Sequence, residues 1–319
     1  MAPTDAVMPW RAVPPHRIAV GGGSDQGWPL PPSMTAGLAG LLASTVLLPS
    51  SLATVAALAA VILLGVPHGA LDGEVARPLL RPRFGRAWFA VFALPYLSLA
   101  AAVLVAWRLA PQATLAAFLA VSVLHFGSED AGPGRPLEAL ARGGLPIALP
   151  VLLHSDAVAR IFGVVTLTPM SAVPAWLHLG ALAWTVLLLP AIATMTAARR
   201  WRGLIEMAVL AVGFLIVPPL PAFAFYFVAL HAPRHMAALA AHPRRAPRVR
   251  GLRDAVSRSV PVTALTLLLG AALWPLFPGL PSDRLLALTL QGLAALTLPH
   301  LLLGYLASRG DVIADRDPP

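Results

Sequence analysis

The chain has 319 residues, of which 58% are hydrophobic and 12% are charged, and its mean hydropathy of +0.76 excludes an ordinary soluble domain and indicates a protein of the lipid bilayer. The net charge of +9 comes from 23 basic residues, all arginine, which stand in short groups between apolar runs without interleaved aromatic residues, so no nucleic-acid partner is expected. The absence of cysteine excludes disulfides, iron–sulfur clusters and thiolate ligands, and leaves histidine, carboxylate and carbonyl groups to hold any metal.

The apolar runs predict an all-α integral membrane protein. A transmembrane helix needs about 20 mostly apolar residues, and we expect about ten such helices in one bundle, or eight to ten if short segments are re-entrant. Residues 1–32 are expected to form a flexible cytoplasmic N-terminal tail, 33–308 the polytopic membrane domain, and 309–319 a cytoplasmic C-terminal tail. The predicted spans are 33–49, 51–67, 87–108, 112–128, 143–157, 172–197, 203–219, 221–241, 259–278 and 284–307.

The arginines indicate the orientation of these spans, because short cytoplasmic loops are enriched in arginine. With the N-terminus inside, nineteen of the 23 arginines fall in inside segments. Only Arg108, Arg160 and Arg284 fall outside, and Arg234 lies within a span. The pattern predicts a multi-pass protein of the cell (inner) membrane with both termini in the cytoplasm.

Five histidines are expected at a similar depth, because the second, fourth, eighth and tenth spans all run from outside to inside. They are His68, His125, His231, His235 and His300. Ionisable side chains at membrane depth usually face the bundle interior and indicate a functional site. His231 and His235 lie one turn apart on one helical face, a spacing that suits two ligands of one metal. The alternative is that these histidines only form hydrogen bonds between helices.

Carboxylates follow two of these histidines. Asp72 is expected one turn from His68, where it would accept that imidazole's second ring proton, as metal-bound imidazoles usually require. Glu129 and Asp130 follow His125 and would either orient ligands or lie solvated at the membrane edge. His300 is open to three interpretations: a further ligand, a donor to a ligand, or a residue on the substrate side. Neutral imidazoles without thiolate suit iron(II), zinc, copper or nickel.

Two functions of other classes use the same histidines. A haem protein for electron transfer would ligate haem between facing helices. A transporter would use the histidines as a proton relay without bound metal. A membrane di-iron desaturase fits poorly, because such sites contain adjacent histidines and the chain has no His-His pair.

Four ordered blocks resemble the Brp/Blh family of bacterial and archaeal β-carotene 15,15′-dioxygenases. They are Gly65–Asp72, His125–Asp130, Tyr226–His235 and Pro299–His300, and the segment from Gly143 to Gly163 is similar to the family's central region. The similarity covers roughly residues 50–307, with departures at Gly73 and at Ala232–Pro233.

The resemblance implies cleavage of the central double bond of β-carotene by O₂, giving two molecules of retinal that a rhodopsin can use downstream. It implies non-haem iron(II) held by His68, His125, His231 and His235. Aromatic side chains near the motifs would either line an apolar tunnel for a carotenoid entering from the bilayer or be ordinary packing and lipid-facing residues. The candidates are Phe126, Phe223, Phe225, Tyr226, Phe227 and Tyr305, of which Tyr226 and Tyr305 are favoured because a buried hydroxyl needs a partner.

Overall fold

The computed structural model describes residues 36–41 and 47–316, and all regular structure in these ranges is helical. Six regions are long and apolar enough to cross a membrane: 51–109, 111–131, 136–153, 175–197, 252–276 and 281–308. The expected all-α membrane protein is confirmed at this level, whereas the expected count of ten spans is not. The predicted tail 1–32 and much of the first predicted span, 33–49, lie outside the described residues.

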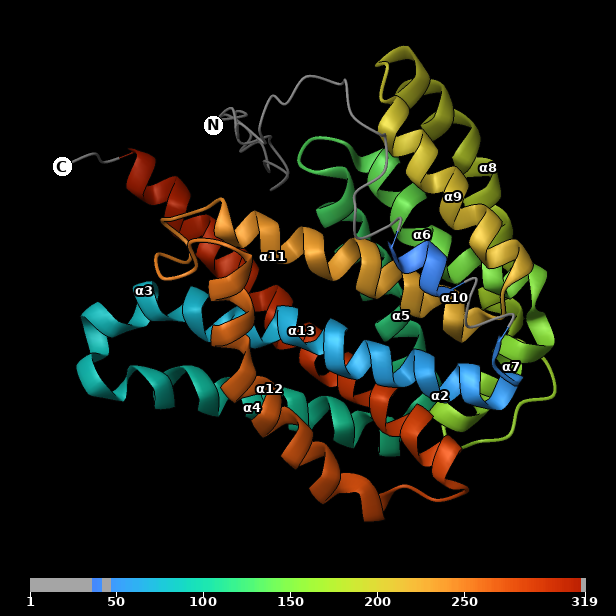
Figure 1. The fold of residues 1–319 in the computed structure, drawn as a ribbon, viewed down its shortest axis with the longest axis horizontal. Coiled ribbons are helices and arrows are strands. Elements are labelled where there is room, and N and C mark those ends of the chain that lie inside the picture. The colour runs from blue at the N-terminus through green and yellow to red at the C-terminus, as the bar shows by residue number, and fades with distance from the viewer. Residues whose placement is uncertain (1–35, 42–46, 317–319) are drawn as a thin grey trace, which may run out of the picture.

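The helices follow one another with short connections (Figure 1). They are α2 (Ser50–Ala60), α3 (Asp72–Phe84), α4 (Trp88–Leu109), α5 (Pro111–Ala131), α6 (Pro136–Leu153), α7 (Ser155–Val165), α8 (Ala175–Ala197), α9 (Trp201–Ile216), α10 (Pro219–Tyr226), α11 (Ala232–Ala240), α12 (Leu252–Leu273) and α13 (Pro281–Arg316). α13 crosses the bundle and continues through residues predicted as the start of the C-terminal tail.

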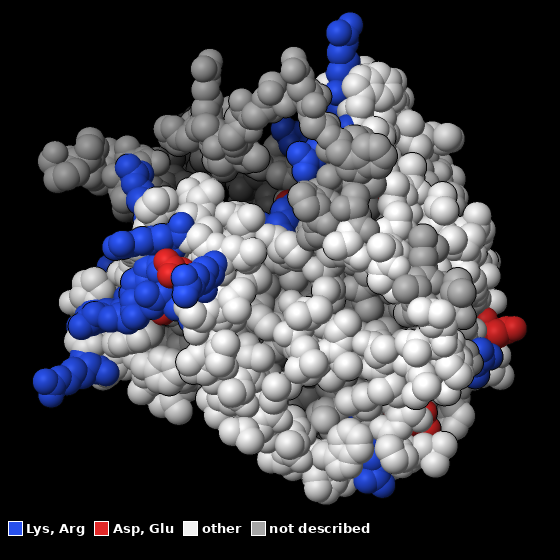
Figure 2. Space-filling model, viewed as in Figure 1, with Lys and Arg blue, Asp and Glu red and all other residues white. Residues whose placement is uncertain are grey.

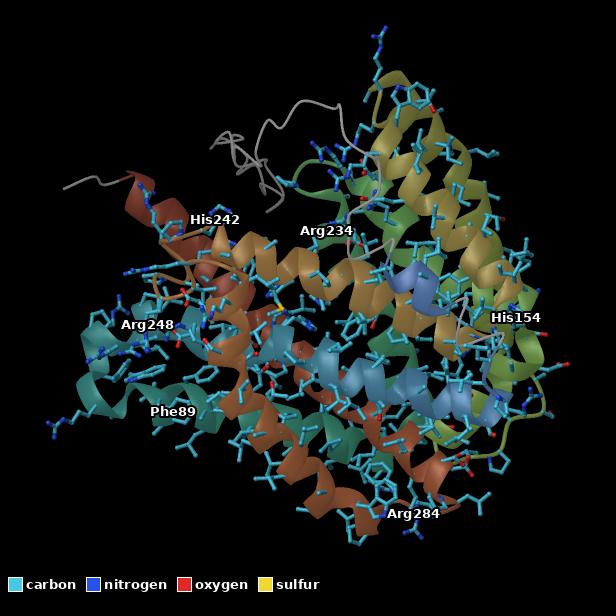
Figure 3. All side chains as sticks on the ribbon, viewed as in Figure 1. Phe89, His154, Arg234, His242, Arg248 and Arg284 are labelled. Carbon is cyan, nitrogen blue, oxygen red and sulfur yellow. The ribbon has the colours of Figure 1, made fainter. Side chains whose placement is uncertain are left out.

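The outer surface of the bundle is apolar. Leu94, Leu189 and Leu268 are 67%, 72% and 69% exposed, which suits contact with lipid chains. Charged side chains are few on the face shown in Figure 2 and gather mainly at one end of the molecule. Arg248 and Arg284, which are predicted on opposite sides of the membrane, lie at the left and at the lower right of the view in Figure 3.

α6 begins earlier than the predicted span 143–157. Pro136 stands at its first turn, where the missing N–H costs nothing, and the helix ends at Leu153. Arg142, expected in a cytoplasmic segment, is therefore helical and only 5% exposed. His154 separates α6 from the short α7, and its Nε2 lies 2.8 Å from the carbonyl oxygen of Phe214 on α9.

Two π-helical segments interrupt the long helical runs. η1 (Val61–Gly65) follows α2 and leads into the 3₁₀ segment η2 (Val66–Leu71), while η4 (Phe227–His231) joins α10 to α11. Each segment is followed within two residues by a proline, Pro67 or Pro233, whose nitrogen cannot donate a helical hydrogen bond. The π-helical turn absorbs that missing bond without ending the helix.

Candidate metal centre

The helical interruptions place histidines at the centre of the bundle. His68 lies on η2 immediately after η1, and His231 is the last residue of η4. A side chain at Gly65 would overlap the ring of Phe227, so the two π-helical segments pack directly on each other. π-helical turns are frequent at functional sites because they redirect side chains within a helix.

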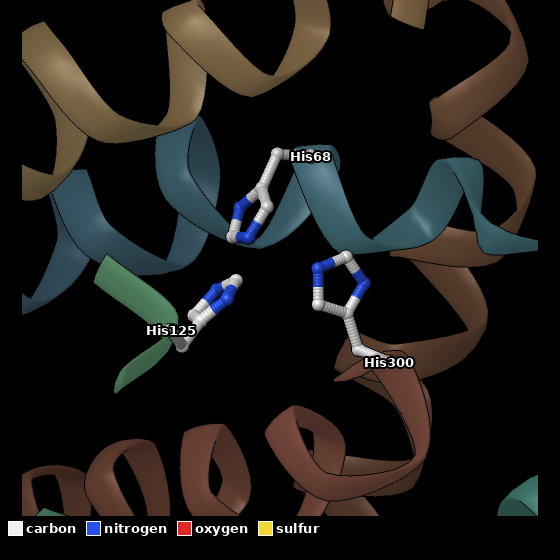
Figure 4. Close-up of side chains that lie close together, drawn as sticks. All are labelled: His68, His125 and His300. Atoms are coloured by element: carbon white, nitrogen blue, oxygen red, sulfur yellow. The ribbon is translucent and has the colours of Figure 1, made fainter. Parts of the chain in front are cut away.

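The structure brings together the five histidines expected at one depth, from η2, α5, η4, α11 and α13. Neighbouring ring centroids are 4.9 to 5.7 Å apart in the pairs His68–His231, His68–His235, His68–His300, His125–His231, His125–His300 and His235–His300. His231 is fully buried, and His68, His125 and His300 are 7%, 4% and 8% exposed. Ligand atoms of His68, His125 and His300 lie within 4.8 Å of one another (Figure 4).

Three of the five rings have a hydrogen-bond partner that leaves the second nitrogen available. His68 donates through Nδ1 to the carbonyl oxygen of Gly65, at 2.5 Å. His235 Nδ1 lies 3.0 Å from Glu129 Oε1, and His300 Nδ1 lies 2.8 Å from Asp72 Oδ1. Asp72 therefore accepts from His300 and not, as expected, from His68.

Several buried nitrogens of the cluster have no hydrogen-bond partner among the described residues: His125 Nδ1, both ring nitrogens of His231, and His235 Nε2. Leaving such polar atoms unpaired away from water costs about 1–3 kcal/mol each. A metal ion accepts the lone pairs of neutral imidazoles and removes that cost, so the residues fit a nitrogen-ligated metal.

Glu129 lies against three of the imidazoles. Besides its bond to His235, its carboxylate approaches His125 Nδ1 and His231 Nε2, each at 3.7 Å. Glu129 belongs to two further groups with metal-ligand spacing, one with His125 and His231 and the other with His235 and His300. The carboxylate is thus part of the cluster, in contrast to the solvated position that the sequence left open.

Asp130 bonds to a network of charged side chains and belongs to none of the groups with metal-ligand spacing among the described residues. Its Oδ2 accepts from the Tyr226 hydroxyl at 2.8 Å, and its Oδ1 accepts from Arg234 at 2.7 Å. Arg234 also donates to both oxygens of Glu206, which receives a further bond from Arg142. Arg234 directly precedes His235, so this network anchors the segment that carries two histidines.

Most of the aromatic candidates adjoin the histidines. Phe126 contacts His231 edge to face with centroids 4.8 Å apart. Phe223, Phe227 and His231 form a stack with successive centroids 5.6 and 5.5 Å apart and interplanar angles of 15° and 17°. Phe225 and Tyr226 are buried, whereas Tyr305 is 53% exposed on α13.

Tyr96 was not predicted from the sequence, yet its hydroxyl donates to Asp72 Oδ2 at 2.8 Å. Tyr96 lies on α4, which carries none of the five histidines. Two features of the sequence could have indicated Tyr96: the chain contains only three tyrosines, and a hydroxyl within an apolar helix needs a hydrogen-bond partner. The network residues Glu206 and Arg142 were missed as well, because nothing in their local sequence connects them to the histidines.

A bundle of apolar helices around a buried set of imidazoles defines a membrane protein with a candidate metal centre. Residues 59–307 match the family model described as beta-carotene 15,15'-dioxygenase, and the chain belongs to this family. It is a carotenoid-cleavage dioxygenase.

Two similar proteins support the assignment. The chain is 32% identical to "Probable beta-carotene 15,15'-dioxygenase Blh" of Halobacterium salinarum over 76% of its own length and 81% of that protein. It is 28% identical to "Beta-carotene 15,15'-dioxygenase" of an uncultured marine bacterium, 66A03, over 77% of its own length and 91% of that protein. No solved structure matches the chain.

Proposed function

We propose that the protein cleaves the central 15,15′ double bond of β-carotene with O₂ and forms two molecules of retinal. The observation that carries the proposal is the buried imidazole cluster with unpartnered nitrogens in a chain of this family. Each half of the substrate gains one oxygen atom as an aldehyde, so both atoms of O₂ are used. The cell inner membrane, with both termini cytoplasmic, would be the site of the reaction, and a rhodopsin would accept the product.

His68, His125, His231 and His235 would hold iron(II), which would supply the binding and activation of O₂. Glu129 would keep the His235 ring oriented through its bond to Nδ1, and the Gly65 carbonyl would do the same for His68. Five rings with neighbouring centroids 4.9 to 5.7 Å apart suit ligands that converge on a single ion, whereas haem is held between two opposed imidazoles.

The aromatic side chains beside the cluster would bind the polyene. Phe126, Phe223 and Phe227 offer flat apolar faces next to His231, and aromatic faces pack well against a conjugated chain. β-Carotene is a rod about as long as the ~30 Å hydrocarbon core is thick, so it would enter laterally from lipid. The apolar wall would also exclude water from the reacting carbons.

The test is the retinal content of a β-carotene-accumulating bacterial host that expresses the chain, measured by chromatography. The intact chain is expected to produce retinal, and His231→Ala is expected to produce none, because it removes a metal ligand. His178→Ala is the matched control, since His178 is an exposed histidine of α8 outside the cluster, and it should retain the activity. Retinal from His231→Ala, or a folded, iron-loaded wild type that yields none, would contradict the proposal.

A further inference from the structure

We propose that His300 is a fifth imidazole of the metal centre and that Asp72 and Tyr96 hold its ring in place for that role. The inference rests on the proposed function above, because it adds a ligand and two positioning residues to the same site.

The hydrogen bond of His300 determines which nitrogen is available to a metal. A carboxylate accepts, so the 2.8 Å contact between His300 Nδ1 and Asp72 Oδ1 places the ring proton on Nδ1. In the neutral ring that a metal ligand requires, Nε2 then retains its lone pair. The bond to Asp72 is the one hydrogen bond that the His300 side chain makes with the described residues, so no protein donor among them occupies Nε2.

The surroundings of His300 show where Nε2 is directed. The ring lies 5.7, 5.3 and 5.1 Å, centroid to centroid, from the rings of His68, His125 and His235. In Figure 4 one nitrogen of His300 points toward the space between His68 and His125. His300 thus faces three of the four proposed ligands, which is the position of a further ligand and not of a residue that only links helices.

Asp72 and Tyr96 hold the His300 ring in place through hydrogen bonds. From the sequence, Asp72 was predicted to do this for His68. Asp72 uses one carboxylate oxygen for His300 and the other for the Tyr96 hydroxyl, each at 2.8 Å. His300 lies on α13, Asp72 on α3 and Tyr96 on α4, so these bonds fix the His300 ring relative to three helices. A carboxylate on the outer N–H of an imidazole is the usual support of a metal ligand, and its loss typically costs 10–100-fold in metal affinity or activity.

The experiment compares the purified full-length chain with His300→Gln, Asp72→Asn and Tyr96→Phe. Two readouts apply besides activity: the rate at which a chelator removes iron, and the visible absorption of protein loaded with cobalt(II), which reports the number of ligands. His300→Gln is expected to lose iron about 10-fold or more faster and to change the cobalt spectrum. Asp72→Asn should have a smaller effect in the same direction, and Tyr96→Phe the smallest.

His154→Gln is the matched control, because the His154 ring also makes one hydrogen bond within the bundle, to the backbone carbonyl of Phe214, but lies outside the cluster. Identical chelation rates and cobalt spectra for His300→Gln, His154→Gln and wild type would overturn the inference. If His300→Gln fails to fold, the milder Asp72→Asn and Tyr96→Phe variants decide by the same readouts. A wild type that takes up no iron would contradict the proposed function, while its cobalt spectra would still decide the role of His300.

Discussion

Arg234→Met is expected to lower the free energy of unfolding by about 3–5 kcal/mol, the range for removing one partner of a buried ion pair. The guanidinium of Arg234 bonds to Asp130 at 2.7 Å and to Glu206 at 2.9 and 3.0 Å. Asp130 and Glu206 are 9% and 2% exposed, so their charges would remain buried with fewer partners. Thermal unfolding of the detergent-solubilised protein measures the loss.

Two further variants identify the cause. Arg160→Met removes an exposed arginine of α7 and should change the free energy of unfolding by no more than about 0.5 kcal/mol. Asp130→Asn combined with Arg234→Met removes one of the two carboxylate charges that Arg234→Met leaves unpaired. The double variant should recover part of the lost free energy of unfolding, since Tyr226 can still donate to the asparagine side chain at position 130. An Arg234→Met protein that unfolds like Arg160→Met would show that the buried network does not stabilise the fold.

The helical class and the approximate helix positions follow from the sequence because apolar runs between arginine groups have few other structures available in lipid. The count of spans does not follow, because the sequence shows no more than apolar length. The run 51–109 illustrates this, since it contains η1, η2 and the reversal at Gly85, where φ is +52°. The predicted spans 51–67 and 87–108 lie on either side of that reversal, so the number of spans depends on whether this continuous helical region is counted once or twice.

The histidines of the site could be predicted because their depth follows from the spans that carry them. The hydrogen-bond partners of their rings could not be predicted, because a ring nitrogen bonds to an acceptor that is near in the folded structure and can be far away in the sequence. Asp72 is one turn from His68 in sequence, yet the 3₁₀ geometry of η2 turns His68 toward Gly65 and leaves Asp72 for His300, 228 residues away. Tyr96 and Glu206 were missed for the same reason: their partners come from other helices.

Gly143→Ala is expected to destabilise the protein, although alanine stabilises a helix interior by about 1 kcal/mol relative to glycine. A Cβ at Gly143 of α6 would overlap the carbonyl oxygen of Val123 and the nitrogen of Gly127 on α5. A Cβ at Gly127 would likewise overlap the backbone of Ala139 on α6. Both obstacles are backbone atoms, which cannot rotate away, so α5 and α6 would have to separate.

The matched control is Gly180→Ala on α8, where a Cβ would meet no atom within 4 Å, so this variant should be neutral or slightly more stable. Gly143→Ala is thus expected to lower the unfolding temperature, with a cost of roughly 1–3 kcal/mol from overpacking, and Gly180→Ala to leave it unchanged or raise it slightly. His125 lies between Val123 and Gly127 in the same turn of α5, so a shift of that turn would move its ring, and Gly143→Ala should also lower the bound metal per chain. Equal unfolding temperatures and metal contents would show that the α5–α6 contact is not what sets the position of His125.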